Sequence, residues 1–117
     1  MITLYGIPNC DTVKKARKWL EAEGIDFTFH DFRKDGLEKA MAERWIATLG
    51  ADVVINRRGT TWRKLPDDRK DLASDADAVA LILEFPAMIK RPVIDRDGAL
   101  HVGFKDDAIA FIGGVNS

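Results

Sequence analysis

The first third of the chain alternates between strand-like and helix-like patterns, and this alternation most limits its fold. Residues 2–5 (ITLY) are rich in apolar and β-branched side chains and stop at a glycine, which indicates a short strand. Residues 11–23 place apolar side chains at helical spacing among lysines and arginines, as an amphipathic helix does. Residues 25–32 put Phe27 and Phe29 at alternate positions, which predicts a second strand. Because a helix connects them, we expect the two strands to be parallel.

A second helix and a less regular segment follow. Residues 37–49 have helical spacing, and we expect them to bury one apolar face made of Leu37, Ala40, Met41, Trp45 and Leu49. Residues 51–70 are rich in arginine and show little of the spacing typical of regular secondary structure, so we expect a short helical piece and a loop. Residues 75–86 predict another helix, which Pro86 ends. Together these segments form a predicted helical insert over about residues 37–86.

The end of the chain predicts a β-hairpin and a last helix. In residues 93–104 an Asp97–Gly98 turn separates two short apolar runs, which is a strong hairpin signal. Residues 105–112 predict a short closing helix. The whole order indicates an α/β fold with a mixed parallel and antiparallel sheet flanked by helices. A chain of 117 residues is long enough for one domain and too short for two, so we expect a single domain over residues 1–117.

Composition and charge exclude several classes of protein. The chain is 46% hydrophobic and 32% charged, as in soluble globular proteins, and no apolar run approaches the ~20 residues of a membrane span. Its net charge of −1 gives no field that favours nucleic acid or anionic membranes. The N-terminus lacks the pattern of a signal peptide, and one cysteine cannot form an internal disulfide. We therefore expect a cytoplasmic protein that binds neither nucleic acid nor membrane.

The single cysteine, Cys10, stands between a turn and the start of the first predicted helix. Free N–H groups and the helix dipole stabilise an anion there, and they can lower the pKa of a cysteine below its ordinary ~8.5. Lys14 and Lys15 add positive charge nearby, whereas Asp11 acts in the opposite direction. A buried structural cysteine is the alternative. The position at a turn before a helix favours a reactive thiol.

The residues around Cys10 limit its chemistry. A self-contained dithiol site needs a second cysteine three residues away, and Ile7 and Val13 occupy those positions. An outside thiol must therefore resolve any oxidised state of Cys10. A mixed disulfide with glutathione is the simplest candidate. As a small oxidoreductase, the protein is expected to be a monomer.

Two later segments add candidate binding residues. In "IKRPVID", residues 89–95, Pro92 precedes a predicted strand, where an X-Pro bond can be cis. Arg91 offers a planar donor fork that suits an oxyanion or a carboxylate, although a surface arginine beside an edge-strand proline is the alternative. In "NRRGTTWRKL", we favour a solvated loop near an anionic ligand over a nucleic-acid contact, and Arg57 or Arg58 would suit a carboxylate of glutathione.

The sequence gives less specific predictions for the two histidines and Trp62. We expect His30 to be structural and His101 to be exposed on the hairpin. With two histidines and one cysteine, the chain offers no convincing ligand set for a metal. Trp62 either packs under the helices, which we favour, or lines a binding groove.

Two long segments resemble the arsenate reductase (ArsC) family, which also includes the Spx-type regulators. They are "ITLYGIPNCDTVKKARKWLEAEGIDFTFHDFRKDGL" and "FPAMIKRPVIDRDGALHVGFKDDAI", and they bracket nearly the whole chain. The "NCDTVKKA" stretch is most similar to the YffB subgroup of glutathione-dependent thiol reductases. The resemblance implies a thioredoxin-like fold of the ArsC type and a thiol oxidoreductase with no bound cofactor and with glutathione as co-substrate.

The resemblance also implies roles for individual residues. Cys10 matches the family's nucleophile, Arg91 matches an arginine that binds the oxyanion or glutathione, and Pro92 matches the cis-proline that faces the active cysteine. We also expect contacts to substrate or glutathione from three further residues: Asn9, Thr12 and Arg57.

The departures from the family pattern define the alternatives. Arsenate reductases use two further arginines, which here fall near Asn56 and near the uncharged Gly103, so specific arsenate binding is not expected. Val13 replaces the second cysteine of an Spx-type dithiol switch. The remaining alternatives are an arsenate reductase that uses glutathione and glutaredoxin, and an Spx-like regulator that binds RNA polymerase without catalysis.

Overall fold

The computed structural model describes residues 1–113, and the chain divides into two units. Met1–Gly36 and the chain from Arg91 onward form the first, here called the sheet unit. Leu37–Lys90 forms the second, here called the helical unit. The helical unit corresponds to the predicted insert, although it extends to Lys90 rather than to about residue 86. That the whole chain is one domain stays a prediction.

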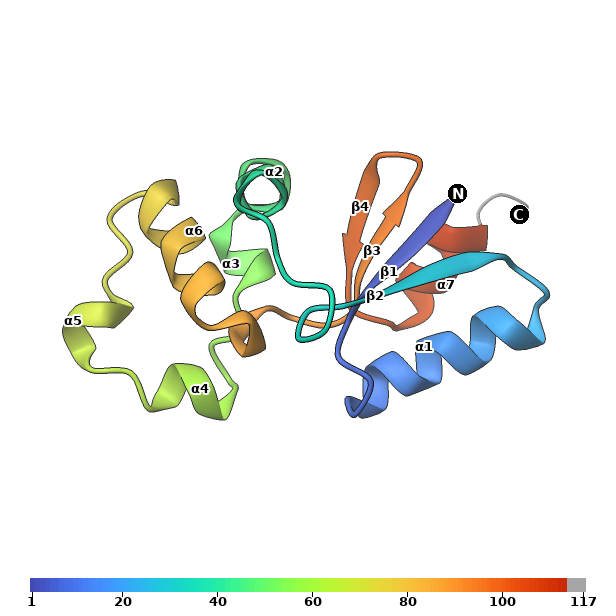
Figure 1. The fold of residues 1–117 in the computed structure, drawn as a ribbon, viewed down its shortest axis with the longest axis horizontal. Coiled ribbons are helices and arrows are strands. Elements are labelled where there is room, and N and C mark those ends of the chain that lie inside the picture. The colour runs from blue at the N-terminus through green and yellow to red at the C-terminus, as the bar shows by residue number, and fades with distance from the viewer. Residues whose placement is uncertain (114–117) are drawn as a thin grey trace. The chain divides into compact units, whose positions relative to one another are not determined.

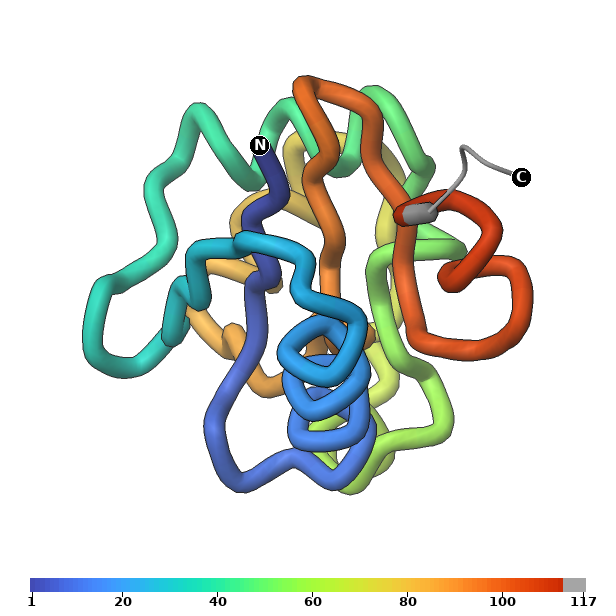
Figure 2. The backbone as a smooth tube through the Cα atoms, turned by 90° about the vertical axis from the view of Figure 1, so that its right-hand side faces the viewer, coloured from blue at the N-terminus to red at the C-terminus, as the bar shows by residue number. Residues whose placement is uncertain are grey.

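The described residues of the sheet unit form a mixed sheet with the strand order β2-β1-β3-β4. β1 (Ile2–Gly6) pairs in parallel with β2 (Phe27–Asp31), and α1 (Asp11–Ala22) connects them, which confirms the predicted strand–helix–strand opening (Figure 1). On its other edge β1 pairs antiparallel with β3 (Val93–Arg96), which in turn pairs antiparallel with β4 (Ala99–Val102). Figure 2 shows β3, in orange, running beside the blue β1.

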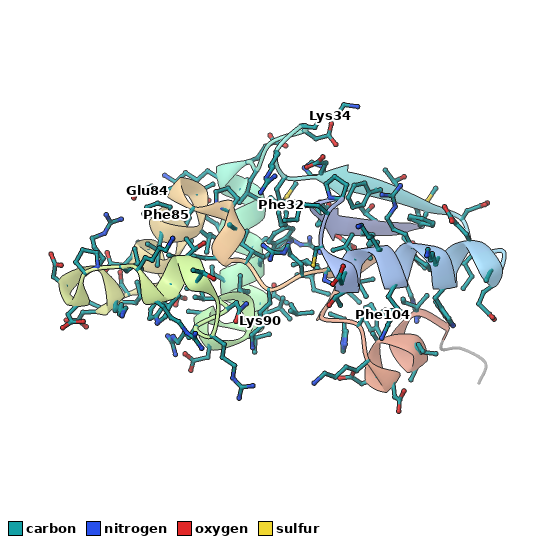
Figure 3. The ribbon with its side chains drawn as sticks, turned by 90° about the horizontal axis from the view of Figure 1, so that it is seen from below. Phe32, Lys34, Glu84, Phe85, Lys90 and Phe104 are labelled. Carbon is teal, nitrogen blue, oxygen red and sulfur yellow. The ribbon has the colours of Figure 1, made fainter. Side chains whose placement is uncertain are left out.

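One apolar core lies between this sheet and two helices, α1 and α7 (Asp106–Gly113). Both helices therefore cover the same face of the sheet. Phe104, which precedes α7, lies between the two helices, and its ring centroid is 5.9 Å from that of Trp19 (Figure 3). The buried members of this core are Ile2, Leu4, Val13, Ala16, Leu20, Ile94, Phe104, Ala108 and Ile112.

The hairpin between β3 and β4 turns where the sequence predicts. Asp97 and Gly98 both have positive φ, 52° and 96°, and Gly98 N–H donates to Asp95 Oδ1 at 2.8 Å. His101, predicted to be exposed, is instead partly buried, with 21% of its side chain accessible. That prediction is wrong because His101 pairs with Ile94 on the core face, where its ring stacks on Phe111 of α7.

The helical unit consists of short elements. The segment 51–70, predicted as one helical piece and a loop, forms several single-turn helices joined by turns. Ser74 caps the next helix by accepting a hydrogen bond from Asp77 N–H at 3.3 Å. The elements are α2 (Lys39–Leu49), α3 (Ala51–Val54), α4 (Thr60–Arg63), α5 (Asp67–Lys70), α6 (Asp75–Glu84) and the 3₁₀ helix η1 (Pro86–Met88).

The buried face of α2 differs from the predicted one. Trp45 is fully buried as expected, but its companions are Ala42 and Ile46, while Ala40 is exposed. The helix begins only at Lys39, so Leu37 lies outside it, and its packing against α6 selects the buried face.

Across the described residues 1–113, every helix is too short or too polar to cross a membrane.

Candidate functional site

Cys10 is the N-cap residue of α1, and its backbone is held from both sides. Its φ and ψ of −91° and 126° are extended, as is usual at this position. Cys10 N–H donates to Ile7 C=O at 3.3 Å, which closes the preceding turn. Cys10 C=O accepts the N–H of Lys14 at 2.9 Å, which begins the helix. The backbone of Cys10 is therefore fixed at the N-terminus of α1, and its side chain stays partly exposed.

Gly6, the last residue of β1, allows α1 to begin so close to the sheet. A Cβ atom at this position would lie 2.7 Å from Cγ2 of Val13, a side chain that is completely buried in the first turn of α1. Gly6 C=O also accepts the N–H of Phe32 at 2.9 Å. A glycine at this position therefore sets the distance between the strand and the turn that carries the thiol.

The surroundings of the Cys10 sulfur favour its thiolate. Partial burial by itself raises the pKa of Cys10. Three groups act in the opposite direction and outweigh burial: the backbone N–H of Val13, the Arg91 side chain and the backbone N–H of Thr12. The pKa of Cys10 therefore lies below its ordinary value. Within the described part of the chain, the sulfur makes no capping hydrogen bond of standard geometry. The two amides nevertheless belong to the second and third helical residues, which are the donors that an N-cap side chain engages.

The structure brings together the two predicted motifs, which are far apart in the sequence. Arg91 stabilises the Cys10 thiolate by a hydrogen bond and by its charge. The Arg91–Pro92 peptide bond is cis, and Pro92 is buried. Pro92 C=O accepts the N–H of Gly103 at 2.8 Å. Pro92 directly precedes β3, the strand that pairs with β1. The end of β1 and the start of β3 therefore meet at the candidate site.

Three other predicted site residues have less defined positions. Asn9 is exposed in the turn before the thiol, and Thr12 is partly exposed in the first turn of α1. Arg57 belongs to the helical unit, where its guanidinium lies 2.6 Å from Asp52 Oδ1 and 5.3 Å from the ring centre of Trp62. That these residues contact a ligand stays a prediction.

Sequence reasoning missed part of what stabilises the thiolate. It assigned the nearby positive charge to Lys14 and Lys15, whereas the charge that lowers the Cys10 pKa in the described structure is that of Arg91. It treated Val13 only as the site of an absent second cysteine, yet its amide is the strongest stabilising group. The N-cap position of the cysteine was the signal that pointed to these amides.

The histidines have structural surroundings. His30 Nε2 lies 2.7 Å from Gly36 C=O, and its ring centroid is 5.0 Å from that of Tyr5, so the prediction of a structural histidine is confirmed. Within residues 1–113, no group of three or more His, Cys, Asp or Glu side chains is arranged to hold a metal ion.

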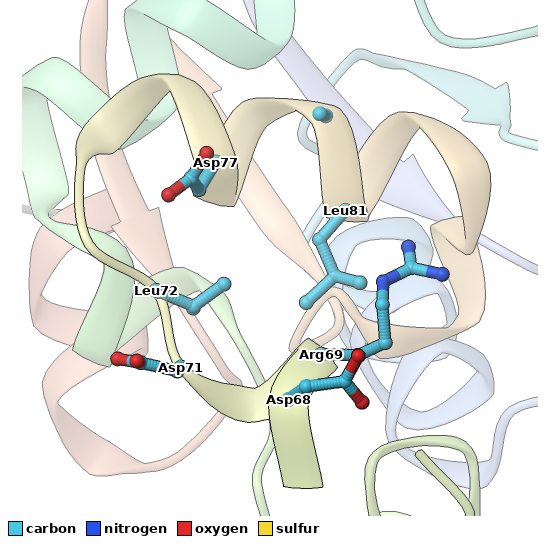
Figure 4. A pocket seen from close by; sticks show the side chains of 7 residues that line it. Asp68, Arg69, Asp71, Leu72, Asp77 and Leu81 are labelled. Atoms are coloured by element: carbon cyan, nitrogen blue, oxygen red, sulfur yellow. The ribbon is translucent and has the colours of Figure 1, made fainter. Parts of the chain in front are cut away.

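Arg69 lines two depressions of the helical unit. Arg69 pairs with Glu84 at 2.5 Å, so its charge is already compensated. The first depression, of about 280 Å³, is lined mainly by acidic and apolar residues (Figure 4): Asp68, Arg69, Asp71, Leu72, Asp77, Ala80 and Leu81. The second, of about 340 Å³, is lined by Thr60, Thr61, Lys64, Leu65, Pro66, Arg69 and Phe85. Neither includes any residue of the Cys10 surroundings.

Comparison with known proteins identifies relatives over nearly the whole chain. The ArsC family model matches residues 5–112. An uncharacterized protein of Haemophilus influenzae is 44% identical over 106 residues, which cover 91% of this chain and 93% of the relative. The global transcriptional regulator Spx of Streptococcus pyogenes is 31% identical over 111 residues, which cover 93% of this chain and 82% of the regulator.

Solved structures give the same picture. A YffB protein superposes with a TM-score of 0.89 at 45% identity, covering 95% of this chain and 97% of the other. An arsenate reductase (ArsC) related protein of Brucella melitensis superposes with a TM-score of 0.77 at 50% identity, covering 96% and 94%. The predicted thioredoxin-like, ArsC-type α/β fold is thereby confirmed.

Proposed function

Because this chain belongs to the ArsC family, we propose that it is a glutathione-dependent thiol oxidoreductase in which Cys10 is the nucleophile. The observation that carries the proposal is the position of the thiol. Cys10 occupies the N-cap position of α1 beside two helix amides and Arg91, which together hold the pKa of its thiol below the ordinary value. A thiolate in a partly exposed position is the reactive form of cysteine.

The proposed reaction consists of two thiol–disulfide exchanges. The Cys10 thiolate attacks one sulfur of a disulfide substrate, the substrate's S–S bond breaks, and its other sulfur leaves as a thiolate. Glutathione thiolate then attacks the resulting mixed disulfide, releases Cys10 as a thiolate, and leaves as the disulfide with the substrate fragment. An external thiol is needed because Cys10 is the single cysteine of the chain. Glutaredoxin could supply this thiol in place of free glutathione.

Arg91 and the neighbouring residues are proposed to hold the anionic groups of the ligand. The guanidinium of Arg91 offers several donors in one plane, so it can stabilise the thiolate and a carboxylate at the same time. Asn9 and Thr12 flank Cys10 and would contact the ligand backbone, and Arg57 would bind a carboxylate. We propose a cytoplasmic monomer for this activity, with no bound cofactor and glutathione as co-substrate.

The reactivity of Cys10 against pH tests this proposal. Because the lowered pKa keeps the thiolate at lower pH, the rate of alkylation by iodoacetamide should reach half its maximum below the ordinary ~8.5 of a free cysteine. In parallel, oxidised glutathione should form a mixed disulfide that mass spectrometry detects and that reduced glutathione removes. Cys10→Ser is the control and should show neither reaction. An alkylation profile like that of a free cysteine would refute the proposal.

Arsenate reduction is a second candidate, favoured by the Brucella melitensis relative. Against it, the hairpin arginine that the resemblance implies falls near the uncharged Gly103, whose φ of 89° lies in a region that favours glycine. We therefore expect slow turnover of arsenate in an assay with glutathione and glutaredoxin. Turnover as fast as that of disulfides would establish the second candidate instead.

Regulation through RNA polymerase is a third candidate, favoured by the identity with Spx of Streptococcus pyogenes. The position that would hold the second cysteine of a dithiol switch is occupied by the buried Val13. A dithiol switch is therefore absent, and under the proposed oxidoreductase function purified RNA polymerase should not bind this protein in a pull-down. Specific binding that persists in Cys10→Ser would support the regulatory candidate.

A further inference from the structure

After its first turn, α1 carries its charges in the order opposite to the one that its helix dipole favours. Asp11 lies in the first turn, four cations follow within residues 14–18, and Glu21 and Glu23 lie at the C-terminal end, where the last turn holds no basic residue. A helix N-terminus carries partial positive charge, so cations near it and anions at the far end are destabilising. Exceptions to such local rules tend to occur at functional sites.

The cations face solvent on the helix that carries the candidate thiol. Lys14 and Lys18 are exposed, and Arg17 is held with its guanidinium carbon 4.4 Å above the ring centre of Phe29. At about 1.5 Å of rise per residue, Lys14 lies about 6 Å along the axis from Cys10, and Glu21 about 16 Å. Apart from Asp11, the charged residues of α1 nearest to the thiol along the helix are therefore cations.

These lysines do not account for the state of the thiol itself. The groups that stabilise the Cys10 anion in the described structure are two backbone amides and Arg91. Exposed charges beside a site instead act on charged molecules that approach it, because they raise the local concentration of the opposite sign. The molecule that reaches Cys10 is a disulfide in the proposed reaction.

Resting on the proposed function, we propose that the basic face of α1, made of Lys14, Lys15, Arg17 and Lys18, selects disulfides that carry carboxylates near the reacting sulfurs. The chemical step is unchanged: the Cys10 thiolate forms a bond to one sulfur, the S–S bond breaks, and the second sulfur leaves with the electron pair. The cations attract the anionic reagent, and among them Lys14 is nearest to Cys10 along the helix. Neutral and cationic disulfides gain nothing from these charges.

A charge-transposed α1 tests the inference at constant net charge. The variant carries Lys14→Glu, Lys18→Glu, Glu21→Lys and Glu23→Lys, so it moves the charges without changing their sum. Stopped-flow kinetics at low salt compare three disulfides: the anionic dithiobis(nitrobenzoate), the neutral dithiodipyridine and the cationic cystamine. The ratio of the anionic to the neutral rate should fall roughly tenfold in the variant. The melting temperature should stay equal or rise, since the new order matches the dipole.

Two controls show whether a change in the ratio of the anionic to the neutral rate comes from the charges near the thiol. Glu21→Lys with Glu23→Lys raises the net charge but alters only the far end of α1, so the ratio should change by less than about twofold. In the wild-type protein, high salt should bring the ratio close to that of the transposed variant, because salt screens exposed charges. If the transposed helix fails to fold, Lys14→Gln with Lys18→Gln replaces it, and the ratio should then fall by roughly threefold.

The outcomes also separate this inference from the function on which it rests. If dithiodipyridine reacts with Cys10 no faster than with a free cysteine, the proposed function is wrong. If dithiodipyridine reacts fast but the ratio of rates is the same in the wild type and the transposed variant, the selection of anionic disulfides is refuted while the reactive thiol stands.

Discussion

The sheet unit and the helical unit hold their candidate arginines in different ways. In the sheet unit, Arg91 acts on Cys10 directly and stabilises its thiolate. In the helical unit, Arg57 pairs with the exposed Asp52 and covers Trp62. One arginine changes the chemistry of a side chain, whereas the other makes a surface ion pair, a kind of contact that contributes little to stability. The comparison teaches that arginine-rich sequence alone does not locate a site, because the neighbours decide what an arginine does.

The largest expected effect tests whether the site depends on the helical unit. Trp45 is completely buried there, so Trp45→Ala should lower the free energy of unfolding by about 3–5 kcal/mol, as measured by urea denaturation. The groups that set the Cys10 pKa all belong to the sheet unit, so that pKa should stay low in the folded variant. Trp62→Ala is the matched control: because this tryptophan is only partly buried, the loss should be smaller. A Cys10 pKa that returned to its ordinary value in folded Trp45→Ala would break the comparison.

A pair of glycine substitutions sharpens the comparison at the level of packing. In the sheet unit, Gly6→Ala places a methyl group 2.7 Å from Val13 Cγ2, and the resulting strain should cost about 1–3 kcal/mol in the free energy of unfolding. In the helical unit, Gly59→Ala meets the side chain of Asn56 at 3.2 Å, so its cost should be below about 1 kcal/mol.

The same pair separates stability from thiol chemistry. Because Val13 also supplies an amide to the thiolate, Gly6→Ala should raise the pKa of Cys10, while Gly59→Ala should leave it unchanged. The pH dependence of the ultraviolet absorbance of the thiolate measures both. Equal behaviour of the two variants would show that Gly6 does not set the position of the first turn of α1.

The smallest expected effect on folding, and the most specific for the site, comes from the arginines. Arg91→Ala removes a hydrogen bond and a charge that favour the thiolate, so the pKa of Cys10 should rise and its alkylation at neutral pH should slow. Arg91→Lys keeps the charge and should have an intermediate effect. Arg57→Ala should leave the pKa unchanged. A rise in the pKa in Arg57→Ala equal to that in Arg91→Ala would place Arg57 among the groups that act on the thiol.

Strong local signals explain why much of the sheet unit could be predicted from the sequence. Glycines bound the first strand and the first helix, and Asp97–Gly98 supplies the positive φ angles of a tight hairpin turn. Cys10 precedes an amphipathic pattern, which located both the helix start and the candidate site. The proximity of Arg91 came from the family resemblance, because no local pattern joins residues so distant in sequence.

The errors concern features that only tertiary packing decides. The buried face of α2 depends on α6, so the periodicity of residues 37–49 alone favoured Ala40 and Met41 over Ala42 and Ile46. The short helices of residues 51–70 are single turns, which leave no period to detect. His101 looked exposed because the hairpin alone does not show that α7 covers one of its faces.

The chain leaves the sheet unit at Gly36 and returns at Arg91, the same residue that stabilises the thiolate. In engineering terms the helical unit is a cassette inserted at one point of a thioredoxin-like scaffold, with a different constraint at each boundary. At its entry, His30 binds the carbonyl of Gly36. At its exit, the Lys90 N–H is bonded to Val54 C=O at 2.8 Å, one residue before the site. A chimera that exchanges the cassette should therefore tolerate changes of length after Gly36 far better than changes of length before Arg91.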